Sequence, residues 1–591
     1  MTVQKVSVKK GRITIPHTMK YNNIESSDGQ GISELFSVYF GSVFDRPTDR
    51  NGLISDMPVV SDFTLSNIVL GEQDVLIKLK QLDGHKGAGP DGIPPVFLKN
   101  CAKELSSPLT FIFNRSLASG IFPTLWKMAY IVPIFKSGDK CSCTNYRPIS
   151  ILSCLAKVFE SLVYTHLYNH LSRFISDKQH GFVRKRSTLS NLLEFKNYLC
   201  QVFASGGQVE SIYLDFSKAF DKVDHYLLCN KLAYYGVHGC LFRWVTCYLE
   251  NRTQLVTVKG HCSLPMPVTS GVPQGSHLGP LLFIIFINDL VNRISCNTLL
   301  YADDMKIFTS VRGDEDCVEL QNDLRTVSEW CVYNKMKLNI EKCCMISFTR
   351  KKNILHYTYN INDKNLSRRS VVRDLGVLID EQLTFRSHYD TITKRSRQLL
   401  GFLIRSTRDF KNPRSILTLF LSLVRSILEY CSPIWSPYYY VHVNSIDRIQ
   451  IKCLKFIYRK YFFGRSFQNY EQRLSKLNLL SLRTRRMRYD LLCLHKVLHS
   501  YIDAPGLLSS LRINTHHRIR CPKIFAMEVH KNNTSYYNPL VRMCRTYNDI
   551  ACGSNDAGFD VFDGNFPAYK RNVTKYIEQD VLSPGSIFLS R

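Results

Sequence analysis

Two stretches of the chain carry acidic residues directly after apolar runs: SIYLDFSKAFD at residues 211–221 and NTLLYADDMKIF at residues 297–308. Runs of apolar, β-branched and aromatic residues of this length predict short strands. The acids Asp215, Asp303 and Asp304 stand at the ends of these strands. An unpaired carboxylate beside an apolar strand costs stability unless a positive charge neutralises it. The sequence therefore predicts a fold that brings three carboxylates together around a positively charged partner.

A divalent cation is the partner that explains three converging carboxylates best. Mg²⁺ takes oxygen ligands and usually binds through one or two carboxylates together with substrate phosphates. Two such ions about 3.5–4 Å apart can clamp the attacking and leaving oxygens of a phosphoryl displacement. An Asp-Asp pair alone is weak evidence, because acids are common in hairpin turns. The sequence around the acids is therefore needed to distinguish a metal site from an ordinary turn.

The surrounding segments resemble a known family of polymerases. Three of them follow the order of polymerase motifs A, B and C: LDFSKAFD at 214–221, SGVPQGS at 270–276 and YADD at 301–304. Four others are IVPIFKSGD at 131–139, NYRPIS at 145–150, KLNIEK at 337–342 and LGVLID at 375–380. Together they resemble the reverse transcriptases of non-LTR (LINE-type, jockey-like) retrotransposons over about residues 80–460. The resemblance implies an RNA-directed DNA polymerase that extends a DNA primer on an RNA template with deoxynucleoside triphosphates.

The resemblance also implies roles for single residues. The three acids would hold two Mg²⁺ or Mn²⁺ ions, with the backbone carbonyl of Phe216 as a further ligand. Lys342 would protonate the leaving pyrophosphate, although Cys343 stands where the family more often has threonine. The residues expected at the nucleotide are Lys136, Arg147, Phe216, Phe220, Gln274 and Gly275.

Each side chain at the nucleotide suits its implied role chemically. A lysine and a forked guanidinium complement triphosphate oxygens. Gly275 permits close backbone approach, and the ring of Phe220 would exclude a 2′-hydroxyl. Asp221 is the second acid of the first motif, and we expect it to pair with a nearby Lys or Arg.

The charge of the chain is strongly positive. The 77 Lys and Arg residues exceed the 49 Asp and Glu residues by 28, a balance that attracts nucleic acid. Between residues 394 and 488 there are 20 Lys and Arg and four acids, in a pattern that is mainly helical. A solvated surface is the alternative interpretation. The resemblance implies a thumb that grips a duplex, and the residues expected to contact its phosphates are Lys394, Arg395, Arg397, Lys452, Lys455, Arg459 and Lys460.

The pattern of helices and strands predicts an α+β fold. The resemblance implies a right-hand polymerase with fingers, palm and thumb, followed by a mainly helical C-terminal region. The expected parts are a linker-like segment at 1–60, fingers and the start of the reverse transcriptase domain at 61–210, the palm with motifs A to E at 211–383, a basic helical thumb at 384–500 and a region of unknown role at 501–591. The reverse transcriptase domain as a whole is expected at about 125–385. Apolar spacing also predicts helices over residues 31–44 and 66–82, the second capped by Ser66.

Other features of the sequence narrow the choice of function. The cysteines lack the spacing of a zinc site, and no apolar run approaches the roughly 20 residues of a membrane span. We therefore expect an intracellular protein. The resemblance implies action in the nucleus, with the cytoplasm as the alternative. LINE-type proteins usually carry an endonuclease before the polymerase, which 60 residues cannot contain, so we expect part of such a protein.

Two other functions compete with a polymerase. A maturase-like or domesticated RNA-binding protein could use the same fold without polymerising, and the three intact acids argue against it. A metal-dependent nuclease would also need clustered acids, but it leaves the motifs at 131–150 and 270–276 unexplained.

Overall fold

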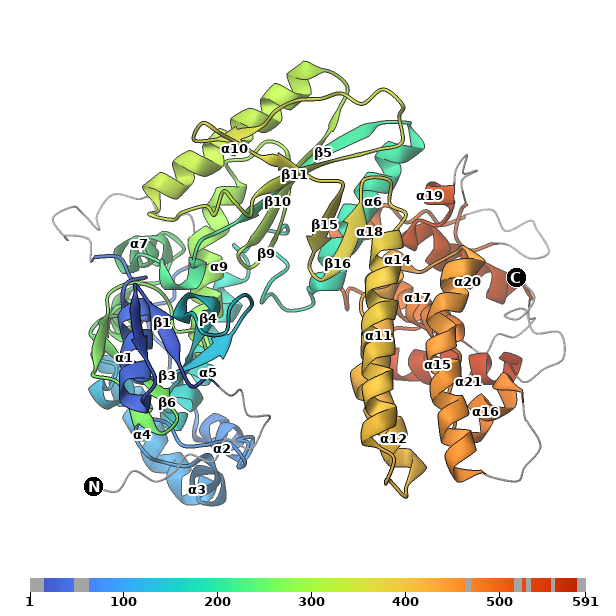
Figure 1. Ribbon diagram of the computed structural model, residues 1–591. Helices are drawn as coiled ribbons and strands as arrows, with labels where there is room; N and C mark the ends of the chain where they lie inside the picture. Colours follow the sequence, from blue (N-terminus) through green and yellow to red (C-terminus); the bar gives the residue numbers. More distant parts are fainter. Residues whose placement is uncertain are drawn as a thin grey trace.

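The computed structural model describes residues 15–46, 63–462, 469–514, 523–527, 533–553 and 559–581. Its elements mix helix and sheet, as predicted. In Figure 1 the ribbons trace an arch: the N-terminal elements lie on the left, a sheet with β5, β10 and β11 lies at the top, and the C-terminal helices lie on the right. None of the helices in the described ranges is both long and apolar enough to cross a bilayer.

The first five-stranded sheet belongs to the N-terminal limb. Its strands are β3 (Met128–Phe135), β4 (Tyr146–Ile151), β6 (Arg252–Val258), β7 (His261–Cys262) and β8 (Met266–Val268), in the order β4-β3-β6-β7 with β8 also on β6. Strands β3 and β4 form an antiparallel pair in which Ile134 lies opposite Arg147. This pairing places Arg147 and the residues after β3 at one end of the sheet.

Residues 15–46 are folded, so the expectation of a linker-like segment at 1–60 is wrong for this part. Strands β1 (Met19–Tyr21) and β2 (Ile24–Ser26) form a hairpin, and helix α1 (Gly29–Gly41) follows, capped by the side chain of Asp28. Met19 and Phe36 are buried in one core with Ile131 and Val256 of the first sheet. The helix expected at 31–44 is thus confirmed in the main, whereas 1–14 and 47–60 lie outside the described residues.

The helix expected at 66–82 begins later than predicted. Helix α2 spans Glu72–Lys80 and its N-cap is Gly71, so Ser66 is not the cap. The residues before it are extended because they have partners elsewhere: the backbone N–H of Leu65 donates to the Gly236 carbonyl, and the backbone of Leu70 bonds to the Asn114 side chain. Local apolar spacing does not reveal such distant partners.

Helices α3 to α9 follow along the chain; α6 packs against the second sheet and the C-terminal helices, and the others lie in the N-terminal limb and below the second sheet (Figure 1). In chain order, helices α3 to α9 span Pro95–Asn100, Ala102–Ser119, Cys154–Leu171, Thr188–Ala204, His225–Tyr234, Gly239–Leu249 and Leu278–Val291, with short 3₁₀ turns at Thr124–Trp126, Cys143–Asn145 and Ala219–Asp221. Helix α9 is buried almost all round, which explains why its sequence is nearly continuously apolar.

The second five-stranded sheet has the order β14-β11-β5-β10-β9. The strands are β5 (Gln208–Asp215), β9 (Asn297–Tyr301), β10 (Asp304–Val311), β11 (Cys344–Thr349) and β14 (Ser367–Arg368). The side chains of β5 alternate between two cores: Ile212 and Leu214 pack with α9, and Val209 packs with α6 and the C-terminal helices. Both faces of β5 are largely buried, including its polar Gln208, Glu210 and Ser211, so the strand shows no alternation of buried and exposed side chains.

The chain after the second sheet is helical, as its sequence pattern predicts. Helix α10 (Asp314–Tyr333) and the hairpins β12–β13 (Asn360–Ile361, Lys364–Asn365) and β15–β16 (Val371–Asp374, Val377–Asp380) lead into it. The helices α11 to α21 span Arg386–Ser406, Pro413–Leu419, Ser426–Glu429, Ser432–Trp435, Tyr440–Tyr461, Tyr470–Lys476, Leu482–Leu498, Pro505–Ser509, Asn533–Tyr536, Pro539–Gly553 and Phe566–Val581, with a π-helical turn at Phe420–Arg425. The described parts of the region after residue 501 share one core with α11, α15 and α17.

Candidate active site

The three acids lie together at one edge of the second sheet. Strands β5 and β10 are antiparallel, and their register places Asp304 directly opposite Asp215. Asp303 lies in the tight turn between β9 and β10, where Ala302 has a φ of +58°. The convergence expected from the two strand-end motifs is therefore present in the fold.

The electrostatics of this edge favour a cation. Removal from water raises the pKa of Asp304 to about 6, and the charges of Asp303 and Asp215 raise it as well. Removal from water also raises the pKa of Asp303, with a further contribution from Asp215. A nearby positive charge stabilises the ionised form of such acids. Binding of a cation at this edge of the sheet would therefore be favourable.

Lys342 supplies one positive charge at this edge. Its Nζ lies 3.2 Å from Oδ2 of Asp215, and both side chains are partly exposed. The segment that carries Lys342 is held against the first motif, because the Asn339 N–H donates to the Asp215 carbonyl at 2.8 Å and the Ser217 N–H donates to the Lys337 carbonyl at 2.7 Å. Lys342 thus lies at the site, as the sequence predicts.

The protein groups alone do not form a closed metal cage. Within the described ranges, no three His, Cys, Asp or Glu side chains are arranged so that they could enclose a metal ion by themselves. Mg²⁺ commonly completes its shell with waters and substrate phosphates, so one or two carboxylates suffice on the protein side. The facing positions of Asp215 and Asp304 on paired strands and the raised pKa of Asp304 fit such an open site.

Two cations of the first sheet act on the same carboxylates. Lys136 follows β3 and Arg147 lies on β4, and both interact electrostatically with Asp303. Removal from water lowers the pKa of Lys136, and the charges of Lys342 and Arg147 lower it further. Like charges gathered in this way are typical of a site that receives an anion.

The two phenylalanines after Asp215 differ in burial. Phe216 is 4% exposed and its ring meets Trp330 edge-on at 6.4 Å, so its side chain belongs to the core. Phe220 is half-buried: its ring stacks on Phe283 at 4.4 Å and meets Phe182 edge-on at 6.2 Å. The Phe216 side chain is therefore not available to a ligand and only its backbone could bind one, whereas the Phe220 ring is partly exposed.

The second motif is attached both to the first motif and to the first sheet. Gln274 donates from Nε2 to Oδ1 of Asp221 at 2.8 Å, and its carbonyl accepts from the Ser150 N–H at 2.8 Å. Gly275 has a φ of +132°, and a Cβ there would lie 2.5 Å from the Ser150 carbonyl oxygen. Close packing against β4 therefore requires a glycine at 275, whether or not a nucleotide approaches it.

Comparison with known proteins agrees with this geometry. Residues 134–404 match the family model described as reverse transcriptase (RNA-dependent DNA polymerase). These residues are similar to a reverse transcriptase domain. The match includes Lys136, Arg147 and Lys342 as well as the three acids. The predicted extent of the domain, about 125–385, is close to the matched range.

Relatives of the reverse transcriptase domain come from non-LTR retrotransposons. The chain is 31% identical over 383 residues to the probable RNA-directed DNA polymerase from transposon BS of Drosophila melanogaster, which covers 61% of this chain and 41% of that protein. It is 28% identical over 415 residues to the RNA-directed DNA polymerase from mobile element jockey of the same species, covering 68% of this chain and 45% of that protein. The predicted resemblance to jockey-like elements is confirmed. The chain spans less than half the length of these relatives.

A solved structure is similar only at a low level. Apo telomerase from Candida tropicalis, truncated from its C-terminal domain, gives a TM-score of 0.32 at 15% identity, covering 48% of this chain and 59% of that one.

Within the described residues Asp221 forms no close ion pair with a lysine or arginine, although the charges of Lys218 and Lys222 act on it. The nearby lysines are engaged elsewhere: Lys218 donates to the hydroxyl of Tyr39 at 2.6 Å, and Lys222 pairs with Asp45 at 2.6 Å. In the described part of the chain, Asp221 instead accepts a hydrogen bond from Gln274. Burial raises the pKa of Asp221 to about 6.

Tyr39 and Asp45 were not predicted at the reverse transcriptase domain, because they lie in the segment that looked like a linker.

We predict that Asp221→Asn stabilises the protein at alkaline pH. A folded-state pKa of about 6 against an ordinary 3.8 means that the folded state binds more protons between these values, so the parent loses stability as the pH rises through them. Asparagine retains the acceptor without the charge, and its advantage should reach about 3 kcal/mol at pH 8 and about half of that at pH 5. Urea unfolding of parent and variant at both pH values measures it, and an advantage that does not change with pH would contradict the assignment.

A second segment that sequence reasoning missed supports the acidic turn. The side chain of Gln179, 2% exposed, accepts from the backbone N–H groups of Ala302 at 2.9 Å and Gly181 at 2.8 Å. The backbone of 178–180 also pairs with Leu300 of β9. A Cβ on Gly181 would lie 2.2 Å from the Ala302 nitrogen, so the close approach requires glycine. The signal in the sequence was a glycine among polar residues, which is too common to mark a site.

The basic helices present most of the predicted cations to solvent. Lys394, Arg395 and Arg397 of α11 are exposed, as are Lys452, Lys455 and Arg459 of α15. Lys460 differs, because its Nζ donates to the carbonyls of Thr407 at 2.7 Å and Arg408 at 2.5 Å. These carbonyls follow the last turn of α11, so Lys460 caps that helix and is not a free phosphate contact.

Proposed function

We propose that the chain is an RNA-directed DNA polymerase that extends a DNA primer on an RNA template with deoxynucleoside triphosphates. The observation that carries the proposal is the alignment of Asp215 and Asp304 on paired strands, with Asp303 beside them, facing Lys136 and Arg147. Acids and cations on opposing sides suit a nucleotide whose triphosphate is held by both. With chromosomal DNA as the source of the primer, the protein would act in the nucleus.

The parts of a right-hand polymerase can be assigned to this fold. We assign the fingers and the start of the domain to residues 61–210, with the β1–β2 hairpin and α1 added to them, because both share a core with β3 and β6. The palm is assigned to 211–383 and the thumb to 384–500. The thumb assignment is supported by the exposed cations of α11 and α15.

Each residue has a defined task in this mechanism. Two Mg²⁺ or Mn²⁺ ions held by Asp215, Asp303, Asp304 and the Phe216 carbonyl would activate the primer hydroxyl and stabilise the leaving oxygen. Lys136 and Arg147 bind triphosphate oxygens and so orient the reacting phosphorus.

Lys342 is placed to act on the leaving group. Its Nζ, now beside Asp215, donates a proton to the leaving pyrophosphate. Gln274 lies with its amide on Asp221, where it fixes the loop that borders the nucleotide.

The competing functions explain less of the structure. A maturase-like RNA-binding protein would need neither the juxtaposed acids nor Lys136 beside them. A nuclease would need acids but not the contact between the Gln274 loop and β4.

Primer extension separates these functions. We expect the full chain to extend oligo(dT) on poly(rA) with dTTP and either Mg²⁺ or Mn²⁺. A failure under both metals, with the template–primer bound, would favour the RNA-binding alternative.

We predict that the exposed cations of α11 hold the template–primer through phosphates. Reversing Lys394, Arg395 and Arg397 to Glu should weaken binding and reduce the dependence of log affinity on log salt. Each lost contact reduces the slope by about 0.9 for B-form duplex and about 0.7 for a single strand. Affinities measured by fluorescence anisotropy over a salt series give this slope.

A matched charge change elsewhere serves as the control. Lys80, Lys99 and Lys103 are exposed on α2, α3 and α4, and their reversal to Glu changes the net charge equally. Equal losses of affinity in the two triple variants would show that only net charge matters and would remove α11 as the binding surface.

A further inference from the structure

The turn that carries Asp303 does not hold its shape alone. Ala302 has a left-handed backbone, and its N–H donates to Oε1 of Gln179 at 2.9 Å. Left-handed conformations are uncommon for residues with a Cβ and persist where their surroundings fix them. The place of Asp303 therefore depends on the place of Gln179.

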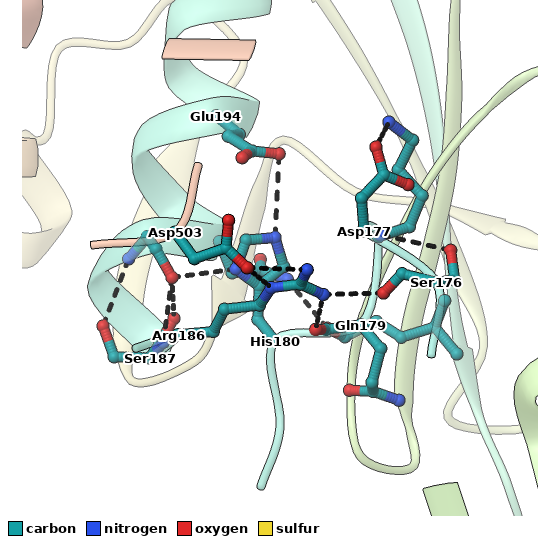
Figure 2. Close-up of polar contacts among 12 residues, drawn as sticks. Ser176, Asp177, Gln179, His180, Arg186, Ser187, Glu194 and Asp503 are labelled. Carbon is teal, nitrogen blue, oxygen red and sulfur yellow. Dashed lines mark hydrogen bonds and ion pairs between the residues drawn. The ribbon is translucent and has the colours of Figure 1, made fainter. Parts of the chain in front are cut away.

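The segment around Gln179 is in turn held by Arg186. Nη1 of Arg186 donates to the carbonyl of Gln179 at 2.8 Å and to the carbonyl of Ser176 at 2.6 Å. Figure 2 shows the guanidinium of Arg186 between these carbonyls and the carboxylate of Asp503. A planar guanidinium can make several such bonds only in one orientation. Arg186 thus closes the loop from 176 to 186 on itself.

Asp503 fixes the orientation of Arg186. Its Oδ2 accepts from Nε at 2.8 Å and lies 2.8 Å from Nη2, and the Asp503 N–H donates to the Lys185 carbonyl at 3.0 Å. The Arg186 side chain is 9% exposed, whereas Asp503 is 42% exposed. A nearly buried guanidinium needs a counter-charge, and Asp503 provides it from the chain between α17 and α18.

A second anchor holds the same loop from α6. Nδ1 of His180 lies 2.8 Å from the hydroxyl of Ser190, and Nε2 lies 3.6 Å from Glu194. His180 is fully buried, so this side of the loop is fixed by the core. Asp503 is the anchor that comes from the region after residue 501.

We propose that Arg186 and Asp503 are positioning residues for Asp303, and that the region after residue 501 thereby forms part of the active-site support. The path runs from Asp503 to Arg186, to the Gln179 backbone, and through the Gln179 side chain to Ala302. Loss of Asp503 should therefore disturb the acidic turn, although Asp503 touches none of the acids. The kinetic part of this inference rests on the proposed polymerase activity.

Amide hydrogen exchange of the full chain tests the path without any activity. In Asp503→Ala, peptides covering 177–187 and 299–304 should exchange roughly tenfold faster, because local opening becomes easier. Asp503→Glu, which keeps the charge, should restore most of the protection. Asp177→Ala is the matched control, since Asp177 is exposed in the same loop and pairs with Lys178. Unchanged exchange at 299–304, or equal effects in Asp177→Ala, would overturn the proposal.

Kinetics distinguish positioning from general damage. Asp503→Ala should lower kcat between roughly 10-fold and 100-fold, while the Kd for template–primer stays within experimental error. Arg186→Lys should lower kcat in the same way, because a lysine cannot reach Asp503 and both carbonyls together. A weakened Kd with unchanged kcat would contradict the proposal. If the parent shows no extension, the polymerase proposal fails separately, and the exchange data alone decide the positioning role.

Discussion

Replacing Asp304 by asparagine is expected to abolish primer extension while RNA binding stays nearly unchanged. Asp304 lies opposite Asp215. Removal from water and the charges of Asp303 and Asp215 raise its pKa to about 6, so a bound cation would stabilise its ionised form. Charge stabilisation by a bound metal is worth several kcal/mol, so kcat should fall by roughly three orders of magnitude or more. The expected contacts between the basic helices and the RNA phosphates do not involve this carboxylate, so RNA binding should remain. Asp303→Asn should behave in the same way.

The measurement is single-turnover extension together with the Kd for template–primer. Asp363→Asn is a suitable control, because Asp363 is an exposed acid in another hairpin turn, between β12 and β13. Extension by Asp304→Asn comparable to that of the parent would remove the metal assignment. Loss of both extension and RNA binding would show that the substitution damages the fold.

Phe220→Val is expected to raise ribonucleotide incorporation far more than it lowers deoxynucleotide incorporation. One face of the Phe220 ring stacks on Phe283, and the ring lies five residues beyond Asp215, after one tight turn. A 2′-hydroxyl pressed against this ring would lose its hydrogen bonds at a cost of about 1–3 kcal/mol. Steric overlap adds to this, and at about 1.4 kcal/mol per tenfold the discrimination should reach about two orders of magnitude. The ratio of kcat/KM for deoxy- and ribonucleoside triphosphates measures it.

The packing of Phe220 provides the competing explanation. Truncation leaves a cavity against Phe283, which lowers stability and both activities together. Phe283→Leu disturbs the same stack from α9 and should lower both activities without changing their ratio. An unchanged ratio in Phe220→Val with a lower Tm would assign Phe220 to the core alone.

The strands that carry the acids were predictable because their signals are local. Strands expected at 211–214, 298–301 and 306–309 correspond to β5, β9 and β10, whose apolar runs are buried on both faces. Acids at the ends of paired antiparallel strands must then meet at one edge. The strands thus follow from local pattern, whereas their pairing joins distant segments and the metal ions themselves stay a prediction.

The unpredicted features depend on partners far away in the sequence. Gln179 acts on Ala302, 123 residues later, and Lys460 caps a helix that ends more than 50 residues earlier. The hairpin at 19–26 is polar and short, and only its burial against β3 and β6 makes it part of the fold. The spacing of apolar and polar residues along the chain does not reveal such long-range contacts.

The most direct test of the central claim is the sequence of the product made on a heteropolymeric RNA template. With parent protein, annealed DNA primer, all four deoxynucleoside triphosphates and Mg²⁺ or Mn²⁺, we expect a DNA complementary to the RNA over many nucleotides. The product should be absent with Asp304→Asn and after removal of the metal by a chelator. Extension without a template, product not complementary to the RNA, or no extension by a parent that binds the template–primer would contradict the account.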